Sequence, residues 1–537
     1  MKREFKDLIR FEQYDNLNSE IKGGYDKAHA VKCVNGTFVG TEEHGVASWL
    51  GIPYAKPPVG GRRFKAPEYV DASDKLFEAK YFGKGAFGSL GYPDCVQTLM
   101  SEDCLYLNIW LNADDKTAKK PVMVWIHGGA YVVGSGSEAS YSGANLVQEH
   151  SDIIFVNINY RLNMYGFMDF SSVPGGENFK TAPCNGLLDQ AMALRWVHEN
   201  IAAFGGDPAK VTIMGESAGA IAVSMLCASP LAKGLFRGAI SESGGSFCPV
   251  DAVRVDNNGI RDVRGSEEYG LAWMKRIGVS SLSELRETDW EKLVSDEQSG
   301  GVGGFWPTVD GYVLPDDQYK MYEAGNYNDV NVLIGTNSDE GSMFVRPTQV
   351  SKYQEDIRAE YGPFAERMLQ LYPASSDGET FAALSDIFRE TAFAWPTWAW
   401  AVLQQKTGKG RVYLYYFDQF NENGGMFGGP GGPGGQRPRP RGAGHASELS
   451  YVFGQSWGRP FEGPEKAVSD AMNEYWANFV KTGDPNGAGL DRWPVYKDGE
   501  KTVMFFKNGT SLIETPNKPQ LLLMEEYFAW KRQQPIR

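Results

Sequence analysis

Short apolar runs alternate with amphipathic segments along the central part of the chain. Short, mainly apolar runs at residues 121–126, 153–158 and 211–214 predict strands buried on both faces, and 236–241 and 330–335 continue the series. Residues 105–111 and 411–417 predict two more strands. Helical spacing of apolar residues appears over 185–204 and 218–228. This alternation predicts an α/β fold with a mostly parallel central sheet and helices on both faces.

The flanking regions follow other patterns. Residues 50–60 carry too much Pro and Gly for a helix or a central strand, and residues 250–410 indicate helical insertions without a linker. Residues 424–444 are rich in Gly and Pro and favour a flexible loop. We therefore expect one domain over residues 1–537, with the 424–444 loop inside it.

Composition and charge exclude several classes of protein. The net charge is −14, which disfavours binding to nucleic acid, and no apolar run reaches the ~20 residues of a membrane span. The N-terminus lacks a secretory signal, so we expect a cytoplasmic protein, or a secreted one whose signal peptide has been removed. Oligomeric state leaves no signal in the sequence.

A candidate nucleophile lies between a predicted strand and a predicted helix. Residues 215–219 read Gly-Glu-Ser-Ala-Gly, which matches G-x-S-x-G and centres on Ser217. A sharp strand-to-helix turn exposes such a serine, and small neighbours relieve crowding. The strand and helix around it favour a nucleophile over an incidental serine.

A serine hydroxyl needs a base to remove its proton, and histidine is scarce in this chain. On this kind of sheet the order along the chain is Ser, then an acid, then His. Five of the six histidines precede Ser217, so His445 is the one base compatible with that order.

The acid that orients His445 should lie between Ser217 and His445 in the sequence, just after a predicted strand. Asp339 and Glu340 come just after the predicted strand at 330–335, and pattern alone does not choose between them. Asp310 is a third possibility, although its surroundings are more typical of a turn.

Acyl transfer also needs hydrogen-bond donors for the developing oxyanion. The backbone N–H of Ala218 is one candidate, and the glycine-rich stretch after the strand at 121–126 is the other source. His127 ends that strand and precedes Ser217, so we expect a structural role for it.

These motifs together resemble the type-B carboxylesterase/lipase family, which includes cholinesterases and bacterial para-nitrobenzyl esterases. The resemblance spans nearly the whole chain and includes Ser-Glu-Asp-Cys-Leu-Tyr-Leu-Asn at 101–108, His-Gly-Gly-Ala at 127–130 and Gly-Thr-Asn-Ser-Asp-Glu-Gly at 335–341. It implies an α/β-hydrolase fold, Glu340 as the acid, and oxyanion donors at Gly129, Ala130 and Ala218.

The cysteines show where the chain departs from these relatives. Cys95 and Cys104 are close enough for a local disulfide in an oxidising compartment. Relatives carry a longer loop there, which in cholinesterases supplies a Trp that stacks on choline; no Trp lies between these cysteines. Cys184 stands where relatives have Gly, and we expect it to be a packing residue.

The sequence therefore predicts a serine esterase with a Ser217–His445–Glu340 triad, acting through an acyl-enzyme on small to medium esters, aryl esters included. Neither a metal nor a cofactor is required. Two alternatives are a non-catalytic binding module, as some relatives are, and a true lipase, which would need a large apolar lid.

Overall fold

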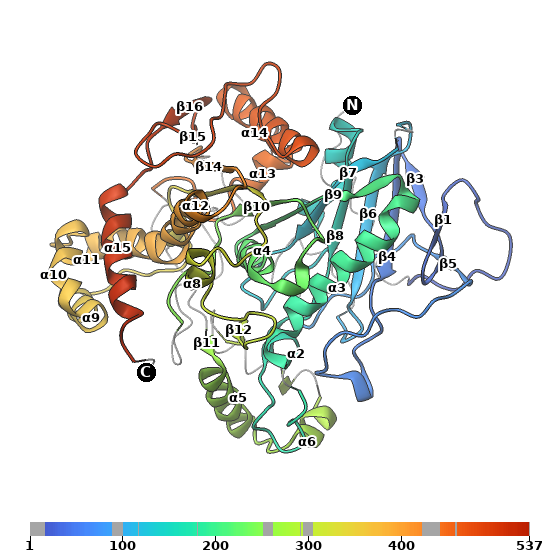
Figure 1. The fold of residues 1–537 in the computed structure, drawn as a ribbon, viewed down its shortest axis with the longest axis horizontal. Coiled ribbons are helices and arrows are strands. Elements are labelled where there is room, and N and C mark those ends of the chain that lie inside the picture. The colour runs from blue at the N-terminus through green and yellow to red at the C-terminus, as the bar shows by residue number, and fades with distance from the viewer. Residues whose placement is uncertain are drawn as a thin grey trace. The chain divides into compact units, whose positions relative to one another are not determined.

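The computed structural model describes residues 17–88, 100–115, 118–179, 181–250, 261–289, 292–293, 304–420, 441–456 and 459–535. These residues form two compact units that are interleaved along the chain. Figure 1 shows the fold coloured by residue number from the N- to the C-terminus. The first unit runs through residues 17–239 and 261–316, and the second through 240–250 and 317–535. Within these residues no helix is long and apolar enough to cross a membrane.

The first unit is built on a mixed sheet with the strand order β3-β4-β6-β8-β7-β9. These strands are β3 (Thr41–Glu43), β4 (Val46–Pro53), β6 (Tyr106–Asn112), β7 (Lys120–Ile126), β8 (Ile154–Ile158) and β9 (Gly206–Glu216). Strands β8, β7 and β9 run parallel, whereas β3, β4, β6 and β8 pair antiparallel. Residues 122–126 of β7 are completely buried, which explains the continuous apolar run in the sequence.

Helices and a small second sheet complete this unit. The helices are α1 (Gly143–Glu149), α2 (Asn163–Phe167), α3 (Asn185–Asn200), α4 (Ala218–Ala228), α5 (Val263–Ile277) and α6 (Leu282–Glu287). The remaining strands are β1 (Ala30–Cys33), β2 (Gly36–Val39) and β5 (Leu76–Glu78), with the pair β11 (Arg261–Asp262) and β12 (Thr308–Val309). Helix α4 packs on β7 and β9, and it begins at Ala218, two residues after the last residue of β9.

The second unit carries the other strands of the chain's α/β pattern. The strands are β10 (Gly238–Glu242, which begins in the first unit), β13 (Asn331–Asn337), β14 (Val412–Phe417), β15 (Val503–Phe506) and β16 (Thr510–Ile513), in that order across the sheet. Strands β13, β14 and β15 are parallel, and β16 is antiparallel to β15. This agrees with the mostly parallel sheet that the sequence predicts.

The helices of the second unit include the insertions expected before residue 410. They are α8 (Gln318–Glu323), α9 (Val350–Tyr361), α10 (Ala365–Leu371), α11 (Asp377–Arg389), α12 (Trp395–Thr407), α13 (Leu449–Val452), α14 (Gly463–Thr482) and α15 (Lys518–Lys531). A π-helical turn, Glu390–Ala394, joins α11 to α12. Figure 1 shows α9, α10 and α11 in yellow beside the red α15.

One sequence expectation is wrong. Residues 50–53 belong to β4, which pairs with β3 on one side and β6 on the other. The register shifts between Trp49 and Ile52, and Gly51 in between has φ +70°. A bulge thus absorbs the glycine, and the proline falls at the last residue of the strand, where a missing N–H is tolerated.

The predicted loop lies mostly outside the described residues, which resume at Arg441. The expectation of one domain over residues 1–537 stays a prediction.

Candidate active site

Ser217 lies in a sharp turn between β9 and α4. Its backbone angles are φ 54° and ψ −124°, a region that costs energy for any residue with a Cβ. The residues before and after it are buried, while Ser217 itself is partly exposed. The turn therefore presents the hydroxyl, as expected for a nucleophile elbow.

The glycines of the motif are required by close packing against the end of β7. A Cβ on Gly219 would lie 2.1 Å from the carbonyl oxygen of Ile126, and a Cβ on Gly215 would lie 2.8 Å from the same oxygen. A Cβ on Gly128 would lie 3.2 Å from the Cβ of Ser217. The glycine-rich turn after β7 therefore lies next to the serine.

That turn has an unusual backbone. Gly129, Ala130 and Tyr131 have φ values of 103°, 55° and 59° in succession. Gly129 and Ala130 are partly exposed, and the Gly129 carbonyl accepts hydrogen bonds from the N–H groups of Val132 and Val133 at 2.9 and 3.0 Å. The two residues predicted as oxyanion donors are thus partly exposed and directly follow Gly128, the residue that lies next to Ser217.

His127 is a core residue, as its position in the sequence suggests. Its ring stacks on Tyr160 with centroids 4.4 Å apart, and Nδ1 lies 2.9 Å from the carbonyl oxygen of Gly128. Burial lowers the pKa of His127 to about 4, so the ring is neutral near pH 7.

Glu340 and His445 form a buried pair in the second unit. Glu340 begins a 3₁₀ turn after β13, and its Oε2 lies 2.6 Å from Nδ1 of His445. Glu340 has no exposed surface, and His445 is 5% exposed. In the tautomer whose Nδ1–H donates to the carboxylate of Glu340, Nε2 is the ring nitrogen left as an acceptor.

Three other groups fix the Glu340–His445 pair. Oε1 of Glu340 accepts hydrogen bonds from the Ser243 hydroxyl at 2.5 Å and from the Asn337 N–H at 2.7 Å. The side-chain amide of Asn337 donates to the carbonyl of Gly444 at 2.9 Å and to the carboxylate of Glu448. Both Glu340 oxygens are thereby occupied, so the carboxylate has one orientation.

Sequence reasoning did not assign roles to these partners. Two of them could have been noticed from their positions in the sequence: Glu448 lies three residues after His445, and Ser243 follows the predicted strand at 236–241. Phe393 also escaped notice: it lies in the π-helical turn and stacks on the His445 ring at 4.6 Å, with Phe344 edge-on at 5.1 Å. π-turns of this kind are frequent at functional sites.

The other two candidate acids have different partners. Asp339 accepts from the Ser385 hydroxyl at 2.9 Å and from the Arg441 N–H at 2.7 Å. Asp310 accepts from the N–H groups of residues 312–314 at 2.8 to 3.0 Å, which closes a turn. Of the three, Glu340 is the carboxylate in contact with His445.

The cysteines behave as small buried residues where they are described. Cys184 has no exposed surface, and its Sγ lies 3.1 Å from the carbonyl of Thr308, in agreement with a packing role. Burial raises the pKa of Cys104. Cys95 lies outside the described residues, so the Cys95–Cys104 bridge stays a prediction. In the part of the chain that the structure describes, no group of three His, Cys, Asp or Glu side chains could hold a metal ion.

Comparison with known proteins places the chain in a family. The model of the carboxylesterase family matches residues 27–523. A para-nitrobenzyl esterase of Bacillus subtilis (strain 168) is 35% identical over 90% of this chain and 95% of its own length. An acetylcholinesterase of Danio rerio is 30% identical over 85% of this chain and 80% of its own length.

Solved structures give the same result for the fold. A PNB esterase structure has a TM-score of 0.77 at 32% identity and covers 93% of this chain and 100% of its own. A carboxylesterase of Geobacillus stearothermophilus also has a TM-score of 0.77 at 32% identity, over 92% of this chain and 99% of its own. The chain therefore belongs to the carboxylesterase family: it is a carboxylic ester hydrolase with the α/β-hydrolase fold.

Proposed function

We propose that this carboxylesterase is a serine hydrolase in which Ser217 is the nucleophile, His445 the general base and Glu340 the carboxylate that orients the base. The observation that carries the proposal is the 2.6 Å hydrogen bond between two buried side chains, Glu340 and His445, 105 positions apart in the sequence. The strained, partly exposed Ser217 supports it independently.

The chemistry follows from the tautomer of His445. With Nδ1–H held by Glu340, Nε2 takes the proton of Ser217 as Oγ attacks the ester carbonyl carbon. The tetrahedral oxyanion accepts hydrogen bonds from the N–H groups of Gly129, Ala130 and Ala218, each worth about 3–4 kcal/mol in the transition state.

Two steps complete the turnover. The C–O bond to the leaving group breaks, and the alcohol leaves with the proton from His445. Water then gives a proton to His445 and attacks the acyl-enzyme, which releases the acid and restores Ser217. The residues needed extend from Gly129 to His445, which is why we propose that residues 1–537 act as one hydrolase domain.

The proposed substrates are small to medium esters, including esters with an aryl group. The support is the 35% identity to a protein named para-nitrobenzyl esterase. A series of para-nitrophenyl esters of increasing acyl length would test this directly. A kcat/KM that rises steadily into long acyl chains would instead favour a true lipase.

Replacement of Ser217 by Ala tests the nucleophile. We expect Ser217→Ala to fold but to lose turnover of a short-chain chromogenic ester and labelling by a fluorophosphonate probe. Ser224→Ala is the matched control, because Ser224 is a buried serine of α4 whose hydroxyl donates to the Ile221 carbonyl at 2.9 Å. Labelling of the folded Ser217→Ala protein at the wild-type rate would contradict the proposal, and a wild-type protein that takes no label would point to a binding module.

A further inference from the structure

The four residues before His445, Arg441–Gly444, are tied to the residue before Glu340. Asp339 forms an isolated parallel β-bridge with Gly444, and the Asp339 N–H donates to the Ala443 carbonyl at 2.8 Å. Asp339 and Gly444 directly precede Glu340 and His445. The bridge therefore fixes, relative to each other, the two backbones that carry the Glu340–His445 hydrogen bond.

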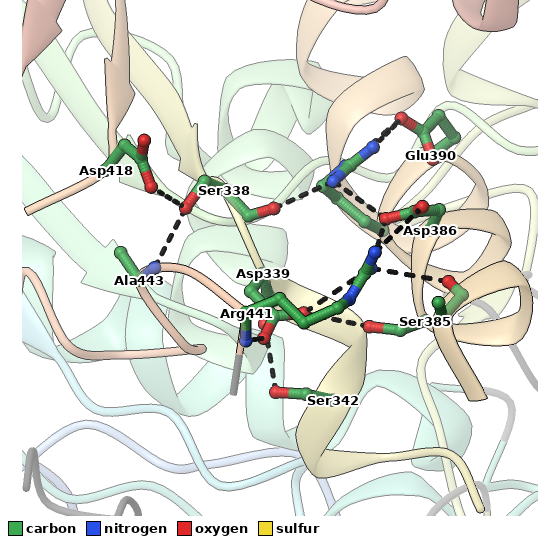
Figure 2. A network of polar contacts seen from close by, with 11 residues as sticks. Ser338, Asp339, Ser342, Ser385, Asp386, Glu390, Asp418, Arg441 and Ala443 are labelled. Atoms are coloured by element: carbon green, nitrogen blue, oxygen red, sulfur yellow. Dashed lines mark hydrogen bonds and ion pairs between the residues drawn. The ribbon is translucent and has the colours of Figure 1, made fainter. Parts of the chain in front are cut away.

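The side chain of Asp339 adds two more contacts (Figure 2). Its Oδ2 accepts from the Arg441 N–H at 2.7 Å, and its Oδ1 accepts from the Ser385 hydroxyl of α11 at 2.9 Å. Asp339 is only 2% exposed, so water does not compete for these bonds. One buried carboxylate thus joins three segments: the end of β13, helix α11 and the stretch before His445.

Helix α11 holds the same stretch a second time. The Arg441 guanidinium contacts the carboxylate of Asp386, with nitrogen–oxygen distances of 2.5 and 3.4 Å. The Arg389 guanidinium contacts Asp386 at 3.1 Å and donates to the Ser338 carbonyl at 2.8 Å, which connects the network back to the end of β13. Arg441 is therefore held by the protein through both its backbone N–H and its guanidinium.

We propose that Asp339 is a positioning residue: it holds the backbone before His445 on the end of β13 and on α11, and thereby sets the Nδ1–Oε2 contact with Glu340. The inference rests on the proposed roles of His445 and Glu340. It assigns to Asp339 no contact with substrate.

The main test compares Asp339→Ala with Asp339→Asn. The alanine variant loses both side-chain contacts, and a shift of the base by about 1 Å is enough to lower kcat about 10- to 100-fold. The asparagine variant keeps them, because its oxygen accepts from the Arg441 N–H and its NH₂ donates to the Ser385 hydroxyl. We expect it to retain kcat within about twofold of wild type, and KM to stay within about twofold in both variants.

Asp329→Ala is the matched control. Asp329 precedes the other end of β13, and its carboxylate accepts from the N–H groups of Lys409 and Gly410 at 2.6 and 2.9 Å. It therefore ties β13 to a neighbouring segment as Asp339 does, but away from His445. We expect it to lower Tm with kcat within about twofold of wild type.

A second readout does not depend on turnover. The Nδ1 proton of His445 should give a downfield ¹H NMR resonance, assigned by its loss in His445→Gln. We expect this resonance to shift or broaden in Asp339→Ala and to persist in Asp339→Asn and Asp329→Ala. If wild type lacks esterase activity but the resonance responds in this way, the proposed function fails while the positioning role stands.

Two results would overturn the inference. One is a folded Asp339→Ala protein with wild-type kcat and an unchanged resonance. The other is an equal loss of kcat in Asp339→Ala and Asp329→Ala that follows their loss of Tm. If Asp339→Ala does not fold, Ser385→Ala is the substitute, because it removes one of the two side-chain contacts of Asp339. A two- to fivefold fall in kcat, which corresponds to about one hydrogen bond, would support the inference. An unchanged kcat would overturn it.

Discussion

Glu340→Gln is the most direct test of the proposal that Glu340 sets the tautomer of His445. Glutamine has the size of glutamate, so the substitution changes hydrogen bonding without opening a cavity at this fully buried position. In the native protein Oε1 accepts from Ser243 and Asn337, while Oε2 faces Nδ1 of His445. The question is which of these places takes the NH₂ group of glutamine.

The backbone decides the orientation. The Asn337 N–H can only donate, so the glutamine oxygen must take the Oε1 place and the NH₂ group must face His445. Nδ1 then has to accept, which moves the ring proton to Nε2 and leaves no lone pair for the proton of Ser217. A wrong tautomer of this kind costs about 10⁴-fold in kcat, or roughly 5 kcal/mol of transition-state stabilisation.

The assay is steady-state hydrolysis of a chromogenic short-chain ester, together with thermal unfolding of each variant. Glu525→Gln is the control, because Glu525 also accepts two hydrogen bonds in the second unit, from the Tyr319 hydroxyl at 2.7 Å and Trp395 Nε1 at 3.0 Å. We expect comparable, small changes in Tm but a loss of kcat only in Glu340→Gln. A folded Glu340→Gln protein with kcat within tenfold of wild type would refute the tautomer argument.

Three further predictions concern the buried framework. Gly219→Ala brings a Cβ to 2.1 Å from the Ile126 carbonyl oxygen, so we expect the free energy of unfolding in urea to fall by about 1–3 kcal/mol and kcat to fall with it. An unchanged urea midpoint would contradict this close packing. Burial lowers the pKa of His127 to about 4, so between pH 6.5 and 4 the ring stays neutral in the folded protein while the unfolded chain binds a proton. The free energy of unfolding should therefore fall by up to about 3 kcal/mol over this range. We expect His127→Phe to remove this part of the pH dependence in the urea unfolding assay. Asp189→Asn leaves Arg161 buried without the carboxylate that it contacts at 2.7 Å, and a cost of about 3–5 kcal/mol is expected in the same assay; a cost below 1 kcal/mol would be inconsistent with the buried pair.

The sequence predicted strands best where burial is complete. Strands β7, β8 and β13 were predicted because a strand covered on both faces is mostly apolar and leaves a short apolar run in the sequence. Strand β16 was missed, since its four residues are half-buried or exposed and leave no apolar run. The β4 bulge was missed for another reason: the effect of Gly51 and Pro53 depends on the register of the neighbouring strand.

The candidate site was predicted to the extent that chain order and local motifs define it. The order of Ser, acid and His, with only six histidines, selected His445. The pattern left Asp339, Glu340 and Asp310 as candidate acids, and the family resemblance pointed to Glu340. The supporting contacts follow no local pattern. Ser243 and Glu340 lie 97 positions apart, and Asp339 and Arg441 lie 102 apart, so only the folded chain reveals that they meet.

Backbone strain is the feature of the candidate site that is hardest to predict from the sequence. Among the described residues, eleven that are not glycine have positive φ, and five of them lie in the candidate site: Ala130, Tyr131, Ser217, Ser243 and Ala446. A left-handed backbone costs such residues roughly 1–2 kcal/mol each, so the fold must impose it. A sequence signals left-handed turns mainly through glycine, and none of these five positions carries one. Strain concentrated where the side chains or N–H groups must point in one direction indicates that stability has been exchanged for geometry at these positions.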